Sequence, residues 1–326
     1  MPANLTPQYQ QAEDAFKAAV TDDERLRYLE EMLKSIPKHK GTEKMQADIK
    51  KRISKLRTAI SEGVGRKQGK ADPYRVAREG AAQVFIIGPA NSGKSSLVGW
   101  LTNAKVVIAP YPYSTTIPIS GMMGYEDISI QLVDTPPVLL DDPQPALLAN
   151  ARLADVLIVV IDTSDFDSMD ALERILELLR DRKVLGEEKD GYGAGITVDR
   201  LIIAASKCDL PEANENAEML RELIKGYSIV ECSSVTGQGV HELAAMVFNR
   251  AEIARVYAKP PGGKLERKEP FIVKKGATVE DVAEAIHRDL RTGFKSAKVW
   301  GSSKYAGQSV HRDYVIADGD IVEFDM

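Results

Sequence analysis

The sequence is poor in cysteine and histidine. The cysteines do not indicate a disulfide framework, and the histidines do not have the spacing of metal ligands. Only Cys208 and Cys232 occur in 326 residues, and two cysteines in a chain of this length do not indicate a disulfide framework. We expect both to be small buried packing residues. The four histidines lack the spacing of metal ligands and are expected at the surface or in packing. They are His39, His241, His287 and His311.

Long apolar runs are also missing. No stretch approaches the eighteen or so uninterrupted apolar residues of a membrane-spanning helix. The N-terminus lacks a basic stretch followed by an apolar core, so a secretory signal is not indicated. Hydrophobic residues make up 44% and charged residues 28% of the chain, as in an ordinary globular protein. We therefore expect a cytoplasmic protein of about two or three domains without a membrane partner.

The net charge of −5 hides a basic segment near the N-terminus. Between Lys38 and Arg78 there are thirteen lysine or arginine residues and four acidic residues. This asymmetry indicates an anionic partner. On one side of a predicted helix lie Lys50, Lys51, Arg52, Lys55 and Arg57. That side is either a solvated face or a nucleic-acid contact, and the pattern leaves both readings open.

Residues 1–66 carry helical patterning. Thr6-Pro7 predicts the start of one helix, and Thr21 with Glu24 forms a capping box before a second. A proline and a glycine then interrupt the pattern. Thr42 begins a further helix, whose apolar residues recur every three or four positions. We expect two or three helices folded as a hairpin.

Residues 67–258 alternate short apolar runs with helical segments. The runs are Val84–Ile87, Ile128–Val133, Val156–Ile161, Leu201–Ala205 and Ile229–Glu231. Nearly continuous apolar strands indicate an α/β domain with a mostly parallel sheet that is covered on both faces. Ligands of such sheets bind where the loops converge at the carboxyl ends of the strands. The stretch Gly186–Gly195, rich in glycine and charge, predicts an exposed loop.

The first of these runs leads directly into a phosphate-binding pattern. Gly88-Pro-Ala-Asn-Ser-Gly-Lys-Ser95 stands between a buried strand and a predicted helix. This setting favours a nucleoside triphosphate site over a glycine turn with an incidental lysine. Backbone N–H groups bent into one concavity would hold the phosphate oxygens. The residues of this cup are Asn91, Ser92, Gly93, Lys94, Ser95 and Ser96.

Two side chains of the loop and one carboxylate would serve the phosphates and a metal ion. Lys94 would reach the β- and γ-phosphates, and the Ser95 hydroxyl would coordinate Mg²⁺. Asp134 directly follows the predicted strand Ile128–Val133. At this position it would hold Mg²⁺ through water. The sequence therefore predicts a magnesium-dependent nucleotide site.

Residues after two later strands select the base. Asp209, in Ser206-Lys-Cys-Asp209, can accept hydrogen bonds from N1–H and from the exocyclic amine of guanine, a donor pair that adenine does not present. The stem of Lys207 would cover the ring. Loop N–H groups of Ser233 and Ser234 would approach the guanine O6. Together these residues, with Ser206, predict selection of GTP over ATP.

The C-terminal part reads as a small separate module. Lys259-Pro-Pro-Gly-Gly-Lys264 has the composition of a linker, which we place at residues 259–268. Residues 269–326 combine a helix predicted at Val279–Leu290, capped from Thr278, with several strand candidates. The strand candidates are Glu269–Lys274, Ala297–Trp300 and Ile321–Phe324. This order suggests an α+β module of the ubiquitin-like (β-grasp) type.

Several motifs resemble those of a known family. Tyr111-Pro-Tyr-Ser-Thr-Thr-Ile-Pro118, followed by Gly121, resembles the first switch of the Obg and DRG (developmentally regulated GTP-binding) GTPases. The C-terminal region resembles the TGS domain of the DRG group through Val299-Trp-Gly-Ser-Ser-Lys304, Gly307-Gln308 and Asp318-Gly-Asp-Ile-Val322. The basic N-terminal helix also resembles the DRG N-terminal region, so the likeness covers nearly the whole chain.

The resemblance implies a Ras-like P-loop G domain with a TGS domain, and it implies slow hydrolysis of GTP. It also implies that Thr115 engages Mg²⁺ and the γ-phosphate as the switch threonine, with Thr116 as the alternative. The ribosome or RNA is the implied partner. The oligomeric state is left open.

Three departures from the family pattern bear on function. The second switch reads Asp134-Thr-Pro-Pro137 in place of Asp, two residues and Gly, and proline has no N–H to donate to the γ-phosphate. The following Val138 cannot orient a water molecule. Ser206 replaces an asparagine that braces the base and the phosphate loop, which predicts weaker but still guanine-biased binding. The distance from Asp134 to Ser206 leaves no room for the domain that DRG proteins insert there.

Two functions remain open on this pattern. One is a slow GTPase whose bound state regulates docking on ribosomes or RNA. The other is a nucleotide-binding adaptor with negligible turnover, in which Pro137 marks a frozen second switch.

Overall fold

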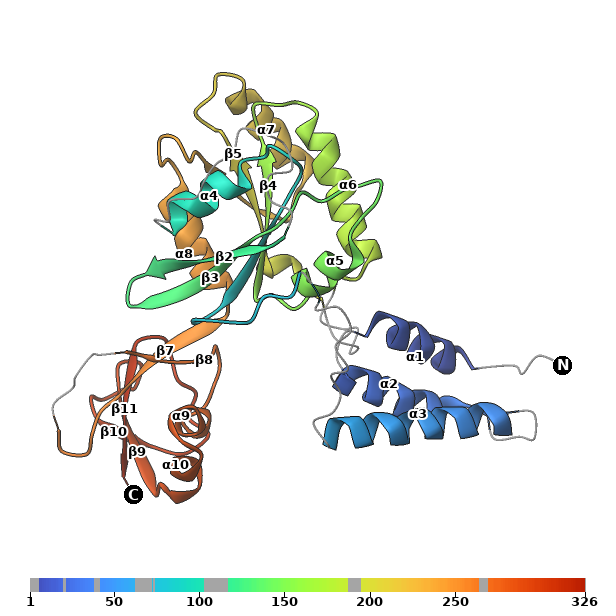
Figure 1. Ribbon diagram of the computed structural model, residues 1–326. Coiled ribbons are helices and arrows are strands. Elements are labelled where there is room, and N and C mark those ends of the chain that lie inside the picture. The colour runs from blue at the N-terminus through green and yellow to red at the C-terminus, as the bar shows by residue number, and fades with distance from the viewer. Residues whose placement is uncertain are drawn as a thin grey trace. The chain divides into compact units, whose positions relative to one another are not determined.

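The computed structural model describes residues 6–19, 22–37, 42–61, 72, 74–102, 117–186, 195–263 and 269–325. The chain divides into two compact units. The first comprises Met1–Asp72 with Glu188–Ala194, and the second comprises Pro73–Glu187 with Gly195–Met326. Figure 1 shows the elements of each unit.

The first unit is built from three helices, α1 (Pro7–Ala18), α2 (Asp22–Ser35) and α3 (Glu43–Ser61). The hydroxyl of Thr6 accepts a hydrogen bond from the Tyr9 N–H and donates one to the Ser35 carbonyl, so it caps α1 and ties it to the end of α2. The helix starts predicted at Thr6-Pro7 and at Thr42 are confirmed. The capping box predicted at Thr21 lies outside the described residues.

The apolar stripes of the three helices meet in one small core. The buried members of this core are Tyr9, Ala12, Leu29, Met32, Ile36, Ile49 and Ile53. Because these residues recur at helical spacing, each helix turns one face inward and leaves a polar face to solvent. On α3 that solvent face includes the exposed residues Lys50, Lys51 and Arg52.

The second unit contains a six-stranded sheet in the order β2-β3-β1-β4-β5-β6. The strands are β1 (Gln83–Ile87), β2 (Ile119–Tyr125), β3 (Ile128–Asp134), β4 (Val156–Asp162), β5 (Leu201–Ser206) and β6 (Ser228–Cys232). All five predicted strands are present and run parallel to one another. The antiparallel edge strand β2 was not predicted, because exposed residues and two glycines break its apolar pattern.

Helices cover both faces of this sheet (Figure 1). One face packs against α4 (Lys94–Leu101) and α8 (Val240–Arg250). The other packs against α5 (Pro145–Ala151), α6 (Ser168–Asp181) and α7 (Ala213–Leu223). A short 3-10 helix, Val198–Arg200, precedes β5. The arrangement is the predicted P-loop α/β fold, and it brings the loops after β1, β3, β4, β5 and β6 to one edge.

A second sheet, of five strands in the order β10-β9-β11-β7-β8, forms the C-terminal module. Its strands are β7 (Ile253–Ala258), β8 (Phe271–Lys274), β9 (Ser296–Trp300), β10 (Gln308–Val310) and β11 (Asp320–Asp325). The helices α9 (Val279–Ile286) and α10 (Arg288–Gly293) belong to the same module. The strands β7 and β10 were not predicted. The predicted division of the chain at residues 258 and 269 stays a proposal.

The single helix predicted over Val279–Leu290 is wrong, because His287 interrupts it. His287 has extended backbone angles, φ −163° and ψ 138°, and its imidazole accepts a hydrogen bond from the Asp289 N–H. The residue thus ends α9 and caps α10. The cap predicted at Thr278 is confirmed as a capping box with Asp281.

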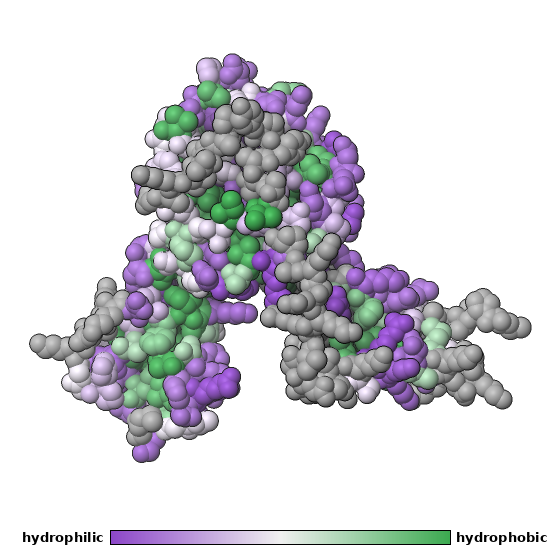
Figure 2. Space-filling model, viewed as in Figure 1, coloured by the Kyte–Doolittle hydropathy of each residue, from purple (hydrophilic) through white to green (hydrophobic). Residues whose placement is uncertain are grey.

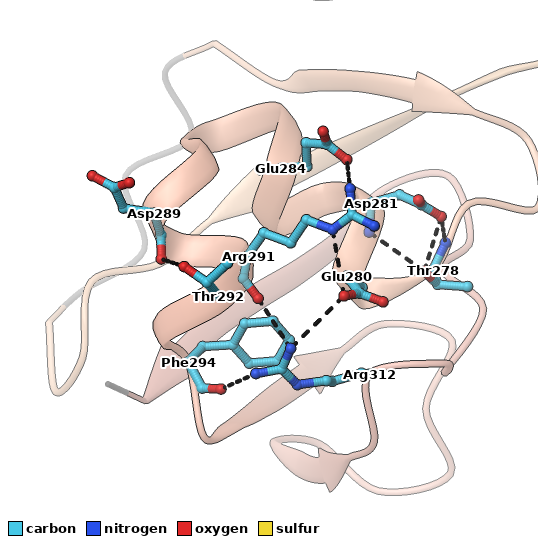
Figure 3. Close-up of polar contacts among 9 residues, drawn as sticks. All are labelled: Thr278, Glu280, Asp281, Glu284, Asp289, Arg291, Thr292, Phe294 and Arg312. Atoms are coloured by element: carbon cyan, nitrogen blue, oxygen red, sulfur yellow. Dashed lines mark hydrogen bonds and ion pairs between the residues drawn. The ribbon is translucent and has the colours of Figure 1, made fainter.

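Two arginines fasten the helices of this module (Figure 3). Arg291 contacts the carboxylates of Glu280 and Glu284 on α9. The Arg312 guanidinium donates to the Arg291 and Phe294 carbonyls and lies 4.3 Å from the centroid of the Phe294 ring. The contacts hold the loop before β11 against α10.

Figure 2 shows a mixed surface on which hydrophobic patches interrupt the hydrophilic cover. Among the most exposed large apolar side chains are Ile117, Ile119, Phe166 and Val235. All four lie at the edge of the six-stranded sheet where the parallel strands end. Phe166 and Val235 follow the ends of β4 and β6. Ile119 pairs with Asp134 at the end of β3, and Ile117 lies shortly before β2. In the described ranges, no helix has the length and apolar character that crossing a bilayer requires.

Candidate nucleotide-binding site

The loop between β1 and α4 has the shape that the phosphate-binding pattern predicts. Gly88 has φ 152°, and a Cβ atom there would lie 2.3 Å from the Val160 carbonyl oxygen, so only glycine fits. Gly93, at the start of α4, has φ 91°. Asn91 also has a positive φ, 61°. The chain therefore wraps tightly against β4 before α4 begins.

Lys94 is folded into this loop. Its ammonium group donates to the carbonyls of Gly88, at 3.2 Å, and Pro89, at 2.6 Å. The residue is 6% exposed. Burial lowers the pKa of Lys94 to about 8, against a smaller opposing effect of Asp134. Burial therefore disfavours the charged form of Lys94 relative to water, and phosphate oxygens bound at this place would stabilise that form.

Ser95 and Asp134 form the polar pair predicted for the metal. The Ser95 hydroxyl donates to Asp134 Oδ2 at 2.6 Å. Asp134 is 4% exposed, and its Oδ1 is buried without a hydrogen-bond partner among the described residues. Burial raises the pKa of Asp134, while Ser95 and Lys94 oppose the rise. A hydroxyl and a carboxylate with an unpartnered oxygen fit a hard cation such as Mg²⁺.

The second switch is fastened to the phosphate-binding loop. The Thr135 hydroxyl donates to the Ile86 carbonyl at 2.7 Å. After Pro136 and Pro137, the next backbone N–H is that of Val138, and it donates to the Gly88 carbonyl at 3.1 Å. The segment that follows Asp134 is thus bound at both ends to β1 and the start of the loop.

The first switch cannot be placed. Thr115 and Thr116 lie in residues 103–116, outside the described part of the chain. The described chain resumes at Ile117, which is 55% exposed, and enters β2 at Ile119. The predicted roles of the two threonines therefore stay predictions.

Ser206 does make a brace to the phosphate loop. Its hydroxyl lies 2.6 Å from the Ser92 carbonyl oxygen and 2.8 Å from that of Ile161. A hydroxyl has one hydrogen, so the two carbonyls share it. Ser206 therefore contacts the phosphate-binding loop although it lacks the amide of asparagine, and the weaker binding expected from this replacement stays a prediction. The contact to the base itself remains a prediction.

Other base-site candidates follow the ends of β5 and β6. Lys207 has a positive φ of 60°, and its ammonium group contacts Asp162 at the end of β4 at 2.5 Å. The carboxylate-bearing Asp209 is exposed at the same edge. Ser233 is buried, its hydroxyl accepts from the Val235 and Thr236 N–H groups, and its own N–H donates to the Gln238 carbonyl. The N–H of Ser233 is therefore engaged within its loop.

Both cysteines are buried, as expected, and Cys208 follows β5 while Cys232 ends β6. The Cys208 N–H donates to the Cys232 carbonyl, at 3.3 Å, and both residues are buried. Burial raises the pKa of Cys208 and raises that of Cys232 to about 12. Their thiols therefore stay protonated at neutral pH and act as packing groups.

The structure brings most predicted site residues to one edge of the sheet. Lys94, Ser95 and Asp134 meet at the loop after β1, and Ser206 joins that loop to β5. The sequence pattern did not indicate Asp162, which pairs with Lys207 and accepts hydrogen bonds from Ser164. Its position at the end of a buried strand was the available signal.

Two family models match separate parts of the chain. A family described as 50S ribosome-binding GTPase matches residues 83–189, and the TGS domain family matches residues 254–324. Among solved structures, the G domain of the Thermotoga maritima FeoB iron transporter is 26% identical, with a TM-score of 0.37, over 52% of this chain and 98% of that chain.

Curated relatives align over most of the chain. An uncharacterized GTP-binding protein of Methanocaldococcus jannaschii is 28% identical over 92% of this chain and 92% of its own length. GTP-binding protein 1 of Schizosaccharomyces pombe is 25% identical, and developmentally-regulated GTP-binding protein 2 of mouse is also 25% identical. Each of the latter two aligns over 92% of this chain and 98% of its own length.

Fold and site together define a GTP-binding protein with a P-loop G domain of the GTPase type and a C-terminal TGS domain. Over most of its length the chain is similar to GTP-binding proteins of the DRG type, which is consistent with the resemblance of its sequence motifs. The alignment with the archaeal relative runs over 362 positions although 92% of a 326-residue chain takes part. The relative therefore carries residues that this shorter chain lacks.

Proposed function

We propose that this protein binds GTP together with Mg²⁺, hydrolyses the nucleotide slowly to GDP and phosphate, and uses the bound state to regulate docking on ribosomes or RNA in the cytoplasm. The observation that carries the proposal is the meeting of Lys94, Ser95 and Asp134 beside the glycine-bounded loop. Anions bind at such helix N-termini because unpaired N–H groups and the helix dipole both favour negative charge.

Guanine selectivity rests on the loops after β5 and β6. Asp209 is exposed at the carboxyl edge, where a purine attached to the phosphates would lie. We assign it the two guanine donors, and we assign the aliphatic stem of Lys207 to the face of the ring. Because the Ser233 N–H donates to Gln238, the Ser234 N–H is the better candidate for the guanine O6.

Ser95, Asp134 and the switch threonine, Thr115, would hold Mg²⁺. When bound, the ion would neutralise charge on the β- and γ-phosphates. The unpartnered Oδ1 of Asp134 supports this assignment. Breaking the direct Ser95–Asp134 hydrogen bond would free both oxygens for the ion and its water.

Hydrolysis would depend on electrostatic positioning by groups of this chain. Lys94 and the loop N–H groups would stabilise charge that develops on the phosphate oxygens, without a covalent intermediate. We expect weak activation of the attacking water, because the Val138 side chain is apolar and the Val138 N–H donates to the Gly88 carbonyl. We therefore expect turnover far slower than that of an enzyme with a water-orienting glutamine.

Ribosome or RNA docking is supported by charge and by the matched family's description. Lys50, Lys51 and Arg52 are exposed on α3, and Arg52 forms an exposed ion pair with Asp48 at 2.8 Å. A phosphate backbone would attract these cations in a salt-dependent way. The family matched at residues 83–189 is described as ribosome-binding.

The anchored second switch favours one alternative, a nucleotide-binding adaptor with negligible turnover. Thr135 and Val138 bind the segment to β1 and the loop, and Pro137 has no N–H for a γ-phosphate. In an adaptor, the terminal domains would bind their partner in every nucleotide state.

Single-turnover hydrolysis separates the two functions. Purified protein in excess over GTP is followed for phosphate release, with Lys94→Ala as the matched control for contaminating GTPases. Phosphate release by the parent above that control supports a GTPase. Micromolar GTP binding with no phosphate above the control supports the adaptor. Co-sedimentation with ribosomes in GDP, a non-hydrolysable GTP analogue or no nucleotide then tests whether docking follows the nucleotide.

A further inference from the structure

The hairpin of β2 and β3 connects the nucleotide site to a turn at its far end. Ile119, the first residue of β2, pairs with Asp134, the last residue of β3. The opposite end of the hairpin is the turn Glu126–Asp127. A seven-residue strand spans about 20 Å, so the turn lies about that far from the proposed metal site.

Arg255 holds this turn to the TGS domain. The residue lies on β7, and its side chain is 11% exposed. Its guanidinium forms ion pairs with Glu126 and, at 2.9 Å, with Asp127. The same group bonds to both carboxylate oxygens of Asp318 in the loop before β11, at 3.0 Å and 2.7 Å. One arginine therefore joins acidic residues from both domains.

Aromatic contacts complete the junction. The Tyr257 hydroxyl, also on β7, donates to Asp127. Tyr125 stacks on Phe248 of α8 with ring centroids 4.9 Å apart, and the Arg255 guanidinium lies 4.8 Å from the Phe248 ring centroid. The hairpin turn, the end of α8 and the first TGS strand thus meet in one cluster.

Apolar contacts also join the TGS strands to the core of the six-stranded sheet near this cluster. Ile253 of β7 and Ile272 of β8 pack against the buried core that contains Ile128 and Ile130 of β3. Because the arginine is largely buried, its ion pairs are screened less than pairs at the surface. We expect a displacement of the turn to displace the strands of the TGS domain as well.

The strand β2 lies at the edge of the six-stranded sheet. Among the residues that the structure describes, β2 pairs with β3 and with no other strand, and most of its side chains are exposed or half-buried. The second switch, in contrast, is fastened through Thr135 and Val138, and Pro137 cannot donate to a γ-phosphate. The end of β2 that lies beside Asp134 is Ile119, so a γ-phosphate bound near Asp134 would act on this end of the hairpin.

We propose that the Arg255 cluster couples the nucleotide state to the orientation of the TGS domain. GTP bound beside Asp134 would displace the Ile119 end of β2, the hairpin would move the Glu126–Asp127 turn, and Arg255 and Tyr257 would pass the movement to β7. This regulation rests on the proposed GTP binding. Because coupling is reciprocal, a partner that binds the TGS domain would also change the preference for GTP over GDP.

The test is a distance measurement in the full chain by pulsed electron spin resonance. Spin labels are placed at Arg182→Cys, at the exposed end of α6, and Ala285→Cys, at an exposed position of α9. The native cysteines are buried, and a labelling reaction without the new cysteines checks that they stay unlabelled. The distance is compared in GDP and in a non-hydrolysable GTP analogue, with binding of both measured on the same samples.

The decisive variant is Glu126→Gln with Asp127→Asn, which removes both ion pairs between Arg255 and the hairpin turn and leaves the Arg255–Asp318 contact of the TGS domain intact. Its matched control is Glu173→Gln with Glu177→Gln, an equal charge change on the exposed side of α6. We expect a nucleotide-dependent distance shift in the parent and in the control. We expect loss of that shift in the decisive variant, with a change of about fivefold or more in its GTP-to-GDP affinity ratio.

Two results would overturn the coupling. One is a shift that persists in the decisive variant. The other is a parent that binds both nucleotides without any shift. A parent that binds neither nucleotide would refute the proposed function and the coupling with it. Arg255→Lys, which keeps the charge but not the two-pronged geometry, is expected to reduce the shift partially.

Discussion

The Ser206 hydroxyl and the Ser92 carbonyl lie 2.6 Å apart, although the two residues are 114 positions apart in the chain. This hydrogen bond ties the end of β5, beside the proposed base pocket, to the loop that would hold the phosphates. It occupies the place where the related GTPases use a longer amide side chain. We therefore expect this bond to affect nucleotide affinity.

We predict that Ser206→Ala weakens binding of GTP and GDP by about fivefold each. The reason is that a buried hydrogen bond contributes about 1 kcal/mol, and without it the loop carbonyl loses its brace. Titration of a fluorescent guanine nucleotide measures the change. Ser206→Asn, which restores the family residue, is expected to bind at least as tightly as the parent. Unchanged affinity in the alanine variant would show that the brace has no role in binding.

We predict that nucleotide affinity falls as pH rises above about 8. Burial holds the pKa of Lys94 near 8 in the nucleotide-free protein, and bound phosphates would raise it by stabilising the charged form. Binding then takes up a proton above pH 8, so the dissociation constant would rise by up to tenfold per pH unit. Titrations of GDP between pH 7 and 9.5 measure this slope.

The control for this profile is Lys183→Ala, which removes an exposed lysine beyond α6 and should give the same pH dependence as the parent. Lys94→Ala should abolish detectable binding of both GTP and GDP. A flat affinity across the range, or nucleotide affinity retained in Lys94→Ala, would contradict the assignment of this lysine to the phosphates.

We predict that Asp209→Asn moves selectivity from guanine toward xanthine nucleotides. The amide offers a donor where the carboxylate accepted a hydrogen bond, and xanthine presents an acceptor at the position of the guanine amine. Competition binding with GDP and XDP gives the ratio of the two affinities. Asp165→Asn, an acidic-to-amide change on the exposed loop after β4, is the matched control. Guanine preference preserved in Asp209→Asn would remove this residue from the base site.

What could be anticipated from sequence differs between the two sheets for a physical reason. The buried strands β1, β3, β4, β5 and β6 were predicted because each carries a nearly unbroken apolar run. The edge strand β2 has no such run, because one side of it meets solvent. β7 directly follows α8 and was not separated from it by the apolar pattern, although its residues belong to the second sheet.

The same contrast holds within the candidate site. Lys94 and Ser95 were predicted because their roles depend on a local motif with fixed spacing. The Ser206 brace and the Arg255 cluster join residues that are distant in sequence, and no local pattern records such pairings. His287 was missed because Leu290 continues the helical spacing across the break, whereas the imidazole cap depends on the backbone angles.

We predict that Pro137→Gly increases the preference for GTP over GDP. Glycine supplies the N–H that the family places opposite the γ-phosphate, and GDP has no group there to accept it. A new hydrogen bond to a charged group contributes about 1.5 kcal/mol or more, which corresponds to a preference about tenfold higher. Parallel titrations with GDP and a non-hydrolysable GTP analogue measure it. Pro136→Gly, which changes the adjacent proline, is the matched control, and an equal change in both variants would attribute the effect to chain flexibility.

We predict that Lys50→Ala with Lys51→Ala weakens RNA or ribosome binding and flattens its salt dependence. Each lysine that neutralises a phosphate contributes close to one unit to the slope of log affinity against log salt concentration for duplexes, and about 0.7 for single strands. Removing two exposed lysines should therefore lower the slope by about one to two units. Co-sedimentation or filter binding at several salt concentrations gives the slope. Glu30→Ala with Glu13→Ala, on α2 and α1, controls for loss of surface charge in the same unit. Equal slopes in the lysine variant and the parent would mean that the basic face of α3 is solvated and contacts no phosphate.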